Sequence, residues 1–322
     1  MREFARPNVI VSKCLGFAHC RYNALTISDD FVEKLKPHVD FRPVCPEVEI
    51  GLGIPREPIR IVAADDELRL IQPATDTDVT DKITEFTDSF LDSAGDADGF
   101  ILKTRSPSCG PKDVKVYPGT GKVMSTSRGA GFFGGAVVEK YPHLAVEDEG
   151  RLKNFGIREH FLTRLFAISS FRKVKESRSM KEIVRFHSEN KYLLMAYNQE
   201  TMRVLGRIVA NLDKKDIDEL IRDYEKHLSE ALSEEPKYTS NINVLMHGMG
   251  YFSEKISSSE KAFFLDSLDR YREGRIPLSV PLNVLRSFII RFQENYLMQQ
   301  TFFEPYPEEL LEISDSGKGR NL

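Results

Sequence analysis

The spacing of hydrophobic and polar positions changes near residue 155. Before that point, short apolar runs such as Val9–Val11 and Phe100–Leu102 alternate with turn residues and with segments of helical length. Such runs, bounded by glycine, proline and polar residues, are typical of strands in an α/β domain. Beyond residue 155 the apolar positions follow a helical repeat. We therefore expect an α/β domain with a parallel-type sheet and flanking helices, followed by an all-α domain.

The pattern predicts individual elements of the first domain. Strands are expected at 6–14, 40–44, 58–63, 68–71, 99–104 and 114–116, with the third and fourth forming a hairpin. Helices are expected at 31–36, 77–94 and 132–140, the last of them after a glycine-rich loop.

The apolar pattern of the second half of the chain predicts seven helices. The helices are expected at 157–170, 180–187, 192–212, 216–232, 239–249, 258–272 and 281–300. Leu205, Ile208, Val209 and Leu212 have the spacing of a stripe that faces a core. The predicted parts are an α/β domain at 1–155, a basic helical connection at 156–186, a helical domain at 187–313 and a flexible tail at 314–322.

Composition narrows the class of protein. The 322 residues are 41% hydrophobic and 29% charged, as in soluble globular proteins. No apolar run approaches the roughly 20 residues that span a bilayer, and the first residues lack the apolar core of a signal peptide. We expect a cytoplasmic protein without a membrane partner.

Charge is distributed unevenly along the chain. Residues 151–210 hold 13 basic and 5 acidic residues, a net charge of +8, whereas the segments before and after it each carry −6. This asymmetry indicates a polyanion partner such as a nucleic acid. The alternative is a solvated helix face that acidic neighbours cover.

Three of the four cysteines stand in short stretches that follow predicted strands. They are Cys14 in Ser-Lys-Cys, Cys45 in Cys-Pro-Glu and Cys109 in Ser-Pro-Ser-Cys-Gly. The carboxyl ends of parallel strands meet at one edge of a sheet, where ligands bind, so three thiols there could hold one inorganic centre. The spacing is neither that of a disulfide framework nor that of a zinc ribbon. The alternative is buried apolar thiols.

These motifs carry a family resemblance. Residues 8–152 resemble the TudS thiouracil desulfidases through the three cysteine stretches, Arg21-Tyr22, the segment 51–56 and the segment 142–152. Residues 187–310 resemble the YbgA-type domain through His187, Lys191, His247, Gln299 and Pro305-Tyr306-Pro307. TudS domains fused to this domain resemble desulfidases that act on 4-thiouridine in tRNA.

The resemblance implies a cofactor and a reaction. A 4Fe–4S cluster would be held by Cys14, Cys45 and Cys109 alone, leaving one iron open to the soft sulfur of a thiolated uracil base. The implied reaction is hydrolytic and non-redox, converting C=S to C=O and releasing hydrosulfide. The fourth cysteine, Cys20, is expected to be a spectator.

The resemblance also assigns roles to polar residues. Glu47 matches the catalytic glutamate, and Ser106 matches a serine that positions water or substrate. A loop-capping carboxylate and a turn-forming serine are the structural alternatives. Arg56 and Arg105 are candidate contacts to a nucleotide, with ordinary ion pairs as the alternative.

The basic connection is the candidate RNA surface. Arg172, Lys173, Lys175 and Arg178 are expected to neutralise phosphates of tRNA while the first domain performs the chemistry. Two rival functions stay open: a desulfidase of free thiouracil or thionucleosides whose helical domain serves oligomerisation, and a non-enzymatic, metal-containing nucleic-acid-binding protein. The oligomeric state is left open.

Overall fold

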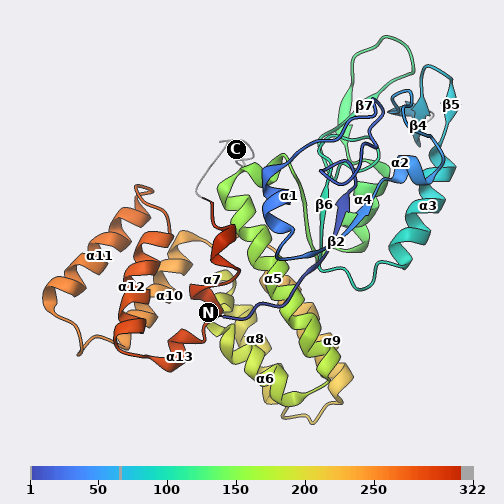
Figure 1. Cartoon of the computed structure of the whole chain (residues 1–322). Coiled ribbons are helices and arrows are strands. Elements are labelled where there is room, and N and C mark those ends of the chain that lie inside the picture. Colours follow the sequence, from blue (N-terminus) through green and yellow to red (C-terminus); the bar gives the residue numbers. More distant parts are fainter. Residues whose placement is uncertain (1, 65–66, 313–322) are drawn as a thin grey trace. The chain divides into compact units, whose positions relative to one another are not determined.

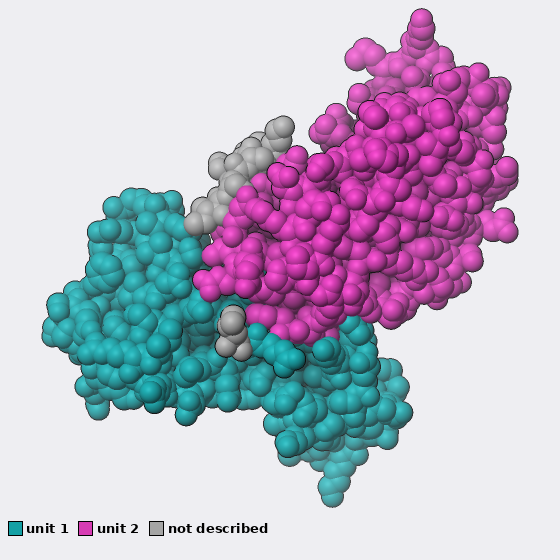
Figure 2. Space-filling model, viewed as in Figure 1, with its two compact units in different colours: residues 1–3, 170–306 teal, residues 4–169, 307–322 magenta. Residues whose placement is uncertain are grey.

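The computed structural model describes residues 2–64 and 67–312 of the chain (Figure 1). The chain forms two compact units, which Figure 2 draws in two colours. The sheet unit comprises Phe4–Ser169 and the chain from Pro307 onward, and the helical unit comprises Ser170–Tyr306 with the first residues. Helix α5 (Phe155–Ser177) contains the point at which the two units divide, and the boundary expected at residue 155 lies at its start. The predicted tail at 314–322 lies outside the described residues.

The first sheet of the sheet unit has four strands in the order β2-β1-β6-β9. All three pairs are parallel, which confirms the predicted parallel-type sheet. The strands are β1 (Asn8–Ser12), β2 (Asp40–Val44), β6 (Gly99–Leu102) and β9 (Ala145–Asp148). The three strands that precede the cysteine stretches are therefore direct neighbours. The fourth, β9, was not expected as a strand.

A second sheet of mixed direction accounts for the remaining strands. Its order is β5-β4-β3-β7-β8, with β3 and β4 forming the predicted antiparallel hairpin. The strands are β3 (Arg60–Ala64), β4 (Glu67–Gln72), β5 (Thr77–Asp78), β7 (Val114–Tyr117) and β8 (Ser127–Gly129). Strand β7 joins β3 in parallel, so residues about 55 positions apart in sequence pair here.

Helices pack against the first sheet to form the core of this unit. The helices are α1 (Asp30–Leu35), α2 (Pro46–Glu49), α3 (Thr80–Asp92) and α4 (Phe132–Lys140), with 3-10 turns at Arg151–Lys153 and Glu308–Leu310. Ile10 and Phe100 of the sheet pack with Leu91 of α3 and Phe133 and Val137 of α4. This core fixes the sheet edge to which the cysteines belong.

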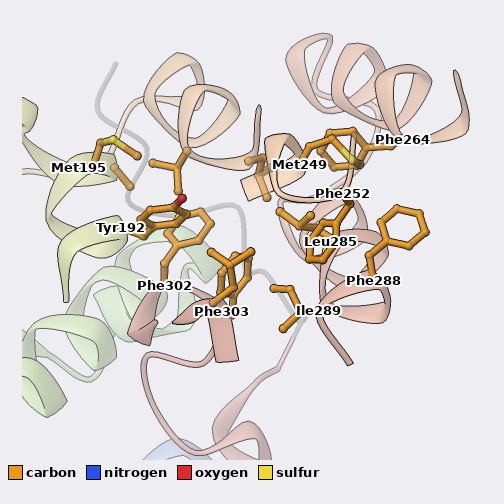
Figure 3. Close-up of a cluster of buried hydrophobic side chains, with 14 of the residues drawn as sticks. Tyr192, Met195, Met249, Phe252, Phe264, Leu285, Phe288, Ile289, Phe302 and Phe303 are labelled. Atoms are coloured by element: carbon orange, nitrogen blue, oxygen red, sulfur yellow. The ribbon is translucent and has the colours of Figure 1, made fainter. Parts of the chain in front are cut away.

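The second unit is helical, as predicted. Its helices after α5 are α6 (Met180–Glu189), α7 (Lys191–Tyr197), α8 (Gln199–Ala210), α9 (Ile217–Ala231), α10 (Tyr238–Gly250), α11 (Ser258–Arg272), α12 (Ser279–Arg291) and α13 (Asn295–Met298), with a 3-10 turn at Thr301–Phe303. A core rich in aromatic residues, including Tyr192, Phe252, Phe288 and Phe303, holds several of them together (Figure 3). No helix in the described ranges has the length and apolar character needed to cross a bilayer.

Two of the predicted helices are interrupted. The segment 192–212 divides at Asn198, whose side chain accepts a hydrogen bond from the backbone N–H of Thr201 and so caps α8. The segment 281–300 divides after α12, where Gln293 has a φ of 51°. The predicted core stripe is wrong at Leu212, which is 87% exposed, because the helix ends at Ala210 and Asn211 turns the chain away in a left-handed conformation.

Candidate active site

The carboxyl ends of β1, β2 and β6 lead into one cavity of about 210 Å³. Cys14 lies two residues beyond β1, Cys45 directly follows β2, and a short loop connects β6 to Cys109. All three cysteines line the cavity, and Cys20 lines it as well. The parallel sheet thus brings together thiols that lie up to 95 positions apart in the sequence.

The loop that carries Cys109 is held by the start of helix α4. Backbone N–H groups of Phe132, Phe133 and Gly134 donate to the carbonyl oxygens of Pro107 and Ser108 at 2.9–3.1 Å. These are the N–H groups that a helix start leaves without partners inside the helix. A Cβ atom at Gly134 would lie 2.3 Å from the carbonyl oxygen of Cys109, so only glycine permits this approach.

Glu47 lies in the first turn of α2 and lines the cavity. Its Oε1 accepts a hydrogen bond from Ser108 Oγ at 2.7 Å, and its Oε2 contacts Arg56 Nη2 at 2.6 Å and Nε at 2.8 Å. The side chains of Glu47 and Arg56 are only 14% and 4% exposed. Arg56 thus donates twice to one carboxylate oxygen while Ser108 donates to the other, and these charge-assisted bonds fix the orientation of the carboxylate.

Two serines connect Glu47 with the backbone at Cys109. The N–H of Cys109 donates to Ser106 Oγ at 3.1 Å, and Ser106 Oγ lies 3.0 Å from Ser108 Oγ. Ser108 is fully buried, and its hydroxyl also lies 3.8 Å from Cys109 Sγ. The predicted serine, Ser106, therefore reaches Glu47 only through Ser108, which the sequence analysis did not single out. The only sequence signal for Ser108 is its place directly before Cys109.

Burial shifts the ionisation of the thiols in the absence of a metal. It raises the pKa of Cys14 to about 11, with a further contribution from the charge of Cys45, and it raises the pKa of Cys109. The hydrogen bond with the Cys20 thiol lowers the pKa of Cys45 to about 7 and raises that of Cys20. Coordination to a metal would favour the thiolate form of each ligand.

The donor set is compatible with the iron–sulfur cluster that the family resemblance implies. Thiolates are the usual ligands of such clusters, and three of them border one cavity. Within residues 2–64 and 67–312, no three His, Cys, Asp or Glu side chains are arranged to hold a metal ion. A cluster of several metal atoms spaces its ligands more widely than a single ion does, so Cys14, Cys45 and Cys109 remain its candidate ligands.

Most of the predicted nucleotide contacts have acidic partners. Arg56 is engaged by Glu47, and Arg105 donates to Asp113 at 2.9 Å. In the basic connection, three residues form ion pairs: Arg172 with Glu176, Lys175 with Glu225, and Arg178 with Asp218. Lys173 is exposed, and no ion pair is found for it among the described residues. The predicted roles of these residues in binding RNA stay predictions.

The histidine of the helical unit that the resemblance singled out is engaged by a tyrosine. His187 Nδ1 lies 3.1 Å from the hydroxyl of the buried Tyr224. Burial, with a contribution from Lys191, lowers the pKa of His187 to about 4. The neutral imidazole is therefore the form that the fold favours.

Comparison with known proteins assigns each part of the chain to a family. The profile of the 2-thiouracil desulfurase family matches residues 9–149, and that of a protein family of unknown function, DUF1722, matches residues 191–307.

Individual relatives match the same two parts. YbbK of Bacillus subtilis (strain 168), described as uncharacterized, is 35% identical over 119 residues, which cover 35% of this chain and 78% of YbbK. YbgA of Escherichia coli (strain K12), also described as uncharacterized, is 29% identical over 158 residues, which cover 48% of this chain and 93% of YbgA. A solved [4Fe-4S]-dependent thiouracil desulfidase, TudS, is 27% identical, with 46% of this chain and 93% of that chain covered. Its TM-score of 0.36 is too low to support a structural argument.

Proposed function

This chain belongs to the family in which a TudS-type thiouracil desulfidase domain precedes a YbgA-type domain, and we propose from this premise that it removes sulfur from 4-thiouridine in tRNA. The observation that carries the proposal is the convergence of Cys14, Cys45, Cys109 and Glu47 on one cavity. The reaction consumes one water, converts C=S to C=O and releases hydrosulfide with one proton, without a change of oxidation state.

Cys14, Cys45 and Cys109 would hold a 4Fe–4S cluster through three thiolates. When bound, the cluster supplies a Lewis-acidic iron without a protein ligand, which suits a soft thiocarbonyl sulfur. Cys20 is the fourth cysteine at the cavity, and its proposed role is that of a spectator.

Glu47 is the proposed base that takes a proton from the attacking water. Arg56 holds one oxygen of its carboxylate, and Ser108 donates to the other. This arrangement fixes the direction from which the carboxylate can accept a proton, which general base catalysis requires. Ser106 and Ser108 link Glu47 to the backbone N–H of Cys109 and so hold the carboxylate in place relative to the loop of Cys109.

The helical unit is proposed to bind the body of the tRNA. Its first 41 residues, 170–210, hold 9 basic and 4 acidic residues, and this excess and the exposed Lys173 support the role. A thiolated base stacked inside folded RNA must be turned out before it reaches a buried cavity, and binding energy from phosphate contacts can offset that cost.

The ion pairs of Arg172, Lys175 and Arg178 favour a second candidate. If these side chains serve the helical fold, the substrate is a free thiouracil or thionucleoside. A single pyrimidine that reaches the cavity needs no RNA contact to meet the thiols and Glu47.

The test is desulfuration of bulk thiolated tRNA by protein reconstituted under anaerobic conditions, followed by loss of the 4-thiouridine absorbance. We expect loss with the unaltered protein and none with Cys109→Ala. Loss of sulfur from free 4-thiouracil but not from tRNA, at a full iron and sulfide complement, would establish the second candidate. One zinc and no iron in the purified protein would contradict both.

A further inference from the structure

The second sheet of the sheet unit presents two different faces. On one face, Ile83 of helix α3 lies in a buried cluster with Ile61 of β3 and Val116 of β7. Successive side chains of a strand point to opposite faces of a sheet. Arg60, directly before Ile61, and Lys115, directly before Val116, therefore belong to the face opposite α3, which we call the outer face.

Three cations lie in one row across the outer face. Lys115 of β7 is directly opposite Arg128 of β8. The parallel register that places Ile61 beside Val116 continues to Arg60 beside Lys115. Neighbouring strands are about 4.8 Å apart, and like charges in opposed positions destabilise a sheet. A bound anion would relieve the repulsion within this cationic row.

The cationic row has few acidic partners. Arg128 forms an ion pair with Asp113, but the same carboxylate is also engaged by Arg105. For Arg60 and Lys115, no ion pair is found within residues 2–64 and 67–312. Lys115 is exposed, so its ammonium group is available to an anion from outside the protein.

An aromatic ring adjoins the row. Tyr117 lies on the same face of β7 as Lys115, and the guanidinium of Arg60 lies 4.9 Å from the centroid of its ring. Aromatic side chains and arginines beside further cations are typical of surfaces that bind RNA, where phosphates meet the cations and unpaired bases stack on the rings.

The opposite side of the same sheet is acidic. Helix α3 exposes four carboxylates whose spacing places them on one side of the helix: Asp81, Glu85, Asp88 and Asp92. Residues 112–128, by contrast, hold four basic residues and one acidic residue, although residues 1–150 together carry −6. A polyanion would therefore be attracted to the outer face and repelled by the exposed side of α3.

We propose that the outer face of the second sheet binds the phosphate backbone of tRNA through Arg60, Lys115 and Arg128. This inference rests on tRNA being the substrate, as proposed above, and adds an RNA surface on the unit that carries the thiols. A nucleic acid backbone presents successive phosphates, which suits a row of cations on successive strands. Such contacts position an RNA without reading its sequence.

The test is the binding of tRNA without thiolated bases, followed by fluorescence anisotropy over a series of salt concentrations. Lys115→Gln should raise Kd about threefold or more and lower the slope of log Kd against log salt by about one, as expected for one lost phosphate contact. Lys115→Glu should have a larger effect, and Lys115→Arg should restore binding. The matched control is Lys82→Gln, an exposed lysine of α3, which should change neither Kd nor the slope.

The reaction with free 4-thiouracil separates this surface from the chemistry. Lys115 does not line the cavity, so Lys115→Gln should leave kcat/KM for 4-thiouracil within about twofold, as is usual for a surface substitution. If no tRNA were desulfurated but tRNA binding still depended on Lys115, the proposed function would fail and the RNA surface would stand. Equal Kd and equal salt dependence for Lys115→Glu and the unaltered protein, or an equal loss in Lys82→Gln, would overturn the surface.

Discussion

A buried polar cluster of the helical unit and the cavity of the sheet unit differ in how their polar groups are partnered. In the helical unit the buried network is closed: Gln300 accepts from the N–H of Tyr192 and donates to the carbonyl of Ser188, and Asn190 bonds Thr301 and Phe186. At the cavity of the sheet unit, four thiols and a carboxylate border open space. A closed network stabilises a fold, whereas partners left available are a requirement for binding and catalysis. The contrast assigns the chemistry to the sheet unit.

Removing a thiol that lines the cavity of the sheet unit should have the largest effect. Cys109→Ala should lose the iron and sulfide of the reconstituted protein and all detectable desulfidase activity, because two thiolates would remain to hold the cluster. Iron and sulfide analysis together with the tRNA assay measures both. Cys20→Ala is the control and should keep the full iron complement, and a loss as complete as that of Cys109→Ala would make Cys20 a ligand.

The second largest effect is expected from a substitution that crowds the loop carrying Cys109. Gly134→Ala places a methyl group against the carbonyl of Cys109 and should destabilise the protein by about 1–3 kcal/mol and reduce iron loading several-fold. Thermal unfolding and iron analysis test this. Gly121→Ala, whose Cβ would have no atom within 4 Å, should change neither quantity. Equal effects of the two substitutions would contradict the role of the close approach.

The serines offer a finer test. Ser108→Ala removes the hydrogen bond to Glu47 and should lower kcat about 10- to 100-fold at an unchanged iron content, as expected for a lost bond to a charged group. Ser106→Ala should have the smaller effect, since Ser106 reaches Glu47 only through Ser108. A larger loss of kcat in Ser106→Ala than in Ser108→Ala would show that Ser106 is the more important serine.

The last prediction concerns the effect of pH on the buried contact of His187 with Tyr224 in the helical unit. The pKa of His187 is lowered from 6.5 to about 4 in the fold, so the folded state binds its proton less readily than the unfolded state does. The stabilisation from neutral His187 is fully present above pH 6.5 and is lost as the pH falls toward 4, amounting to roughly 1–3 kcal/mol. Urea unfolding of the helical signal at pH 7.5 and pH 4.5 should show a smaller loss for His187→Gln. Parallel losses in both proteins would refute this account.

Local patterns predicted much of the fold and singled out the three cysteine stretches that border the cavity. The apolar run Val9–Val11 marks β1, and helix 132–140 has the expected bounds, because the residues involved are close in sequence. The same reasoning failed where one side chain overrides a repeat. Asn198 caps a new helix inside an apolar stretch, and Leu212 follows a helix end at Asn211.

Pairings between distant residues could not be read in this way. Ser108 and Glu47 are 61 positions apart, and the Ser-Pro-Ser pattern does not show which serine faces the carboxylate. Likewise, the sequence offered Arg56 and Arg105 alike as nucleotide contacts. It does not show that Glu47 engages the first and Asp113 the second.

By itself, the sequence determined the α/β and helical halves of this protein and the position of each cysteine stretch relative to its strand. These features depend on apolar periodicity and turn residues within short segments. The strand order β2-β1-β6-β9, and with it the single cavity that unites the thiols with Glu47, was decided only by the tertiary structure. Strand order results from many weak packing contacts between segments far apart in the chain, and no local pattern encodes their sum.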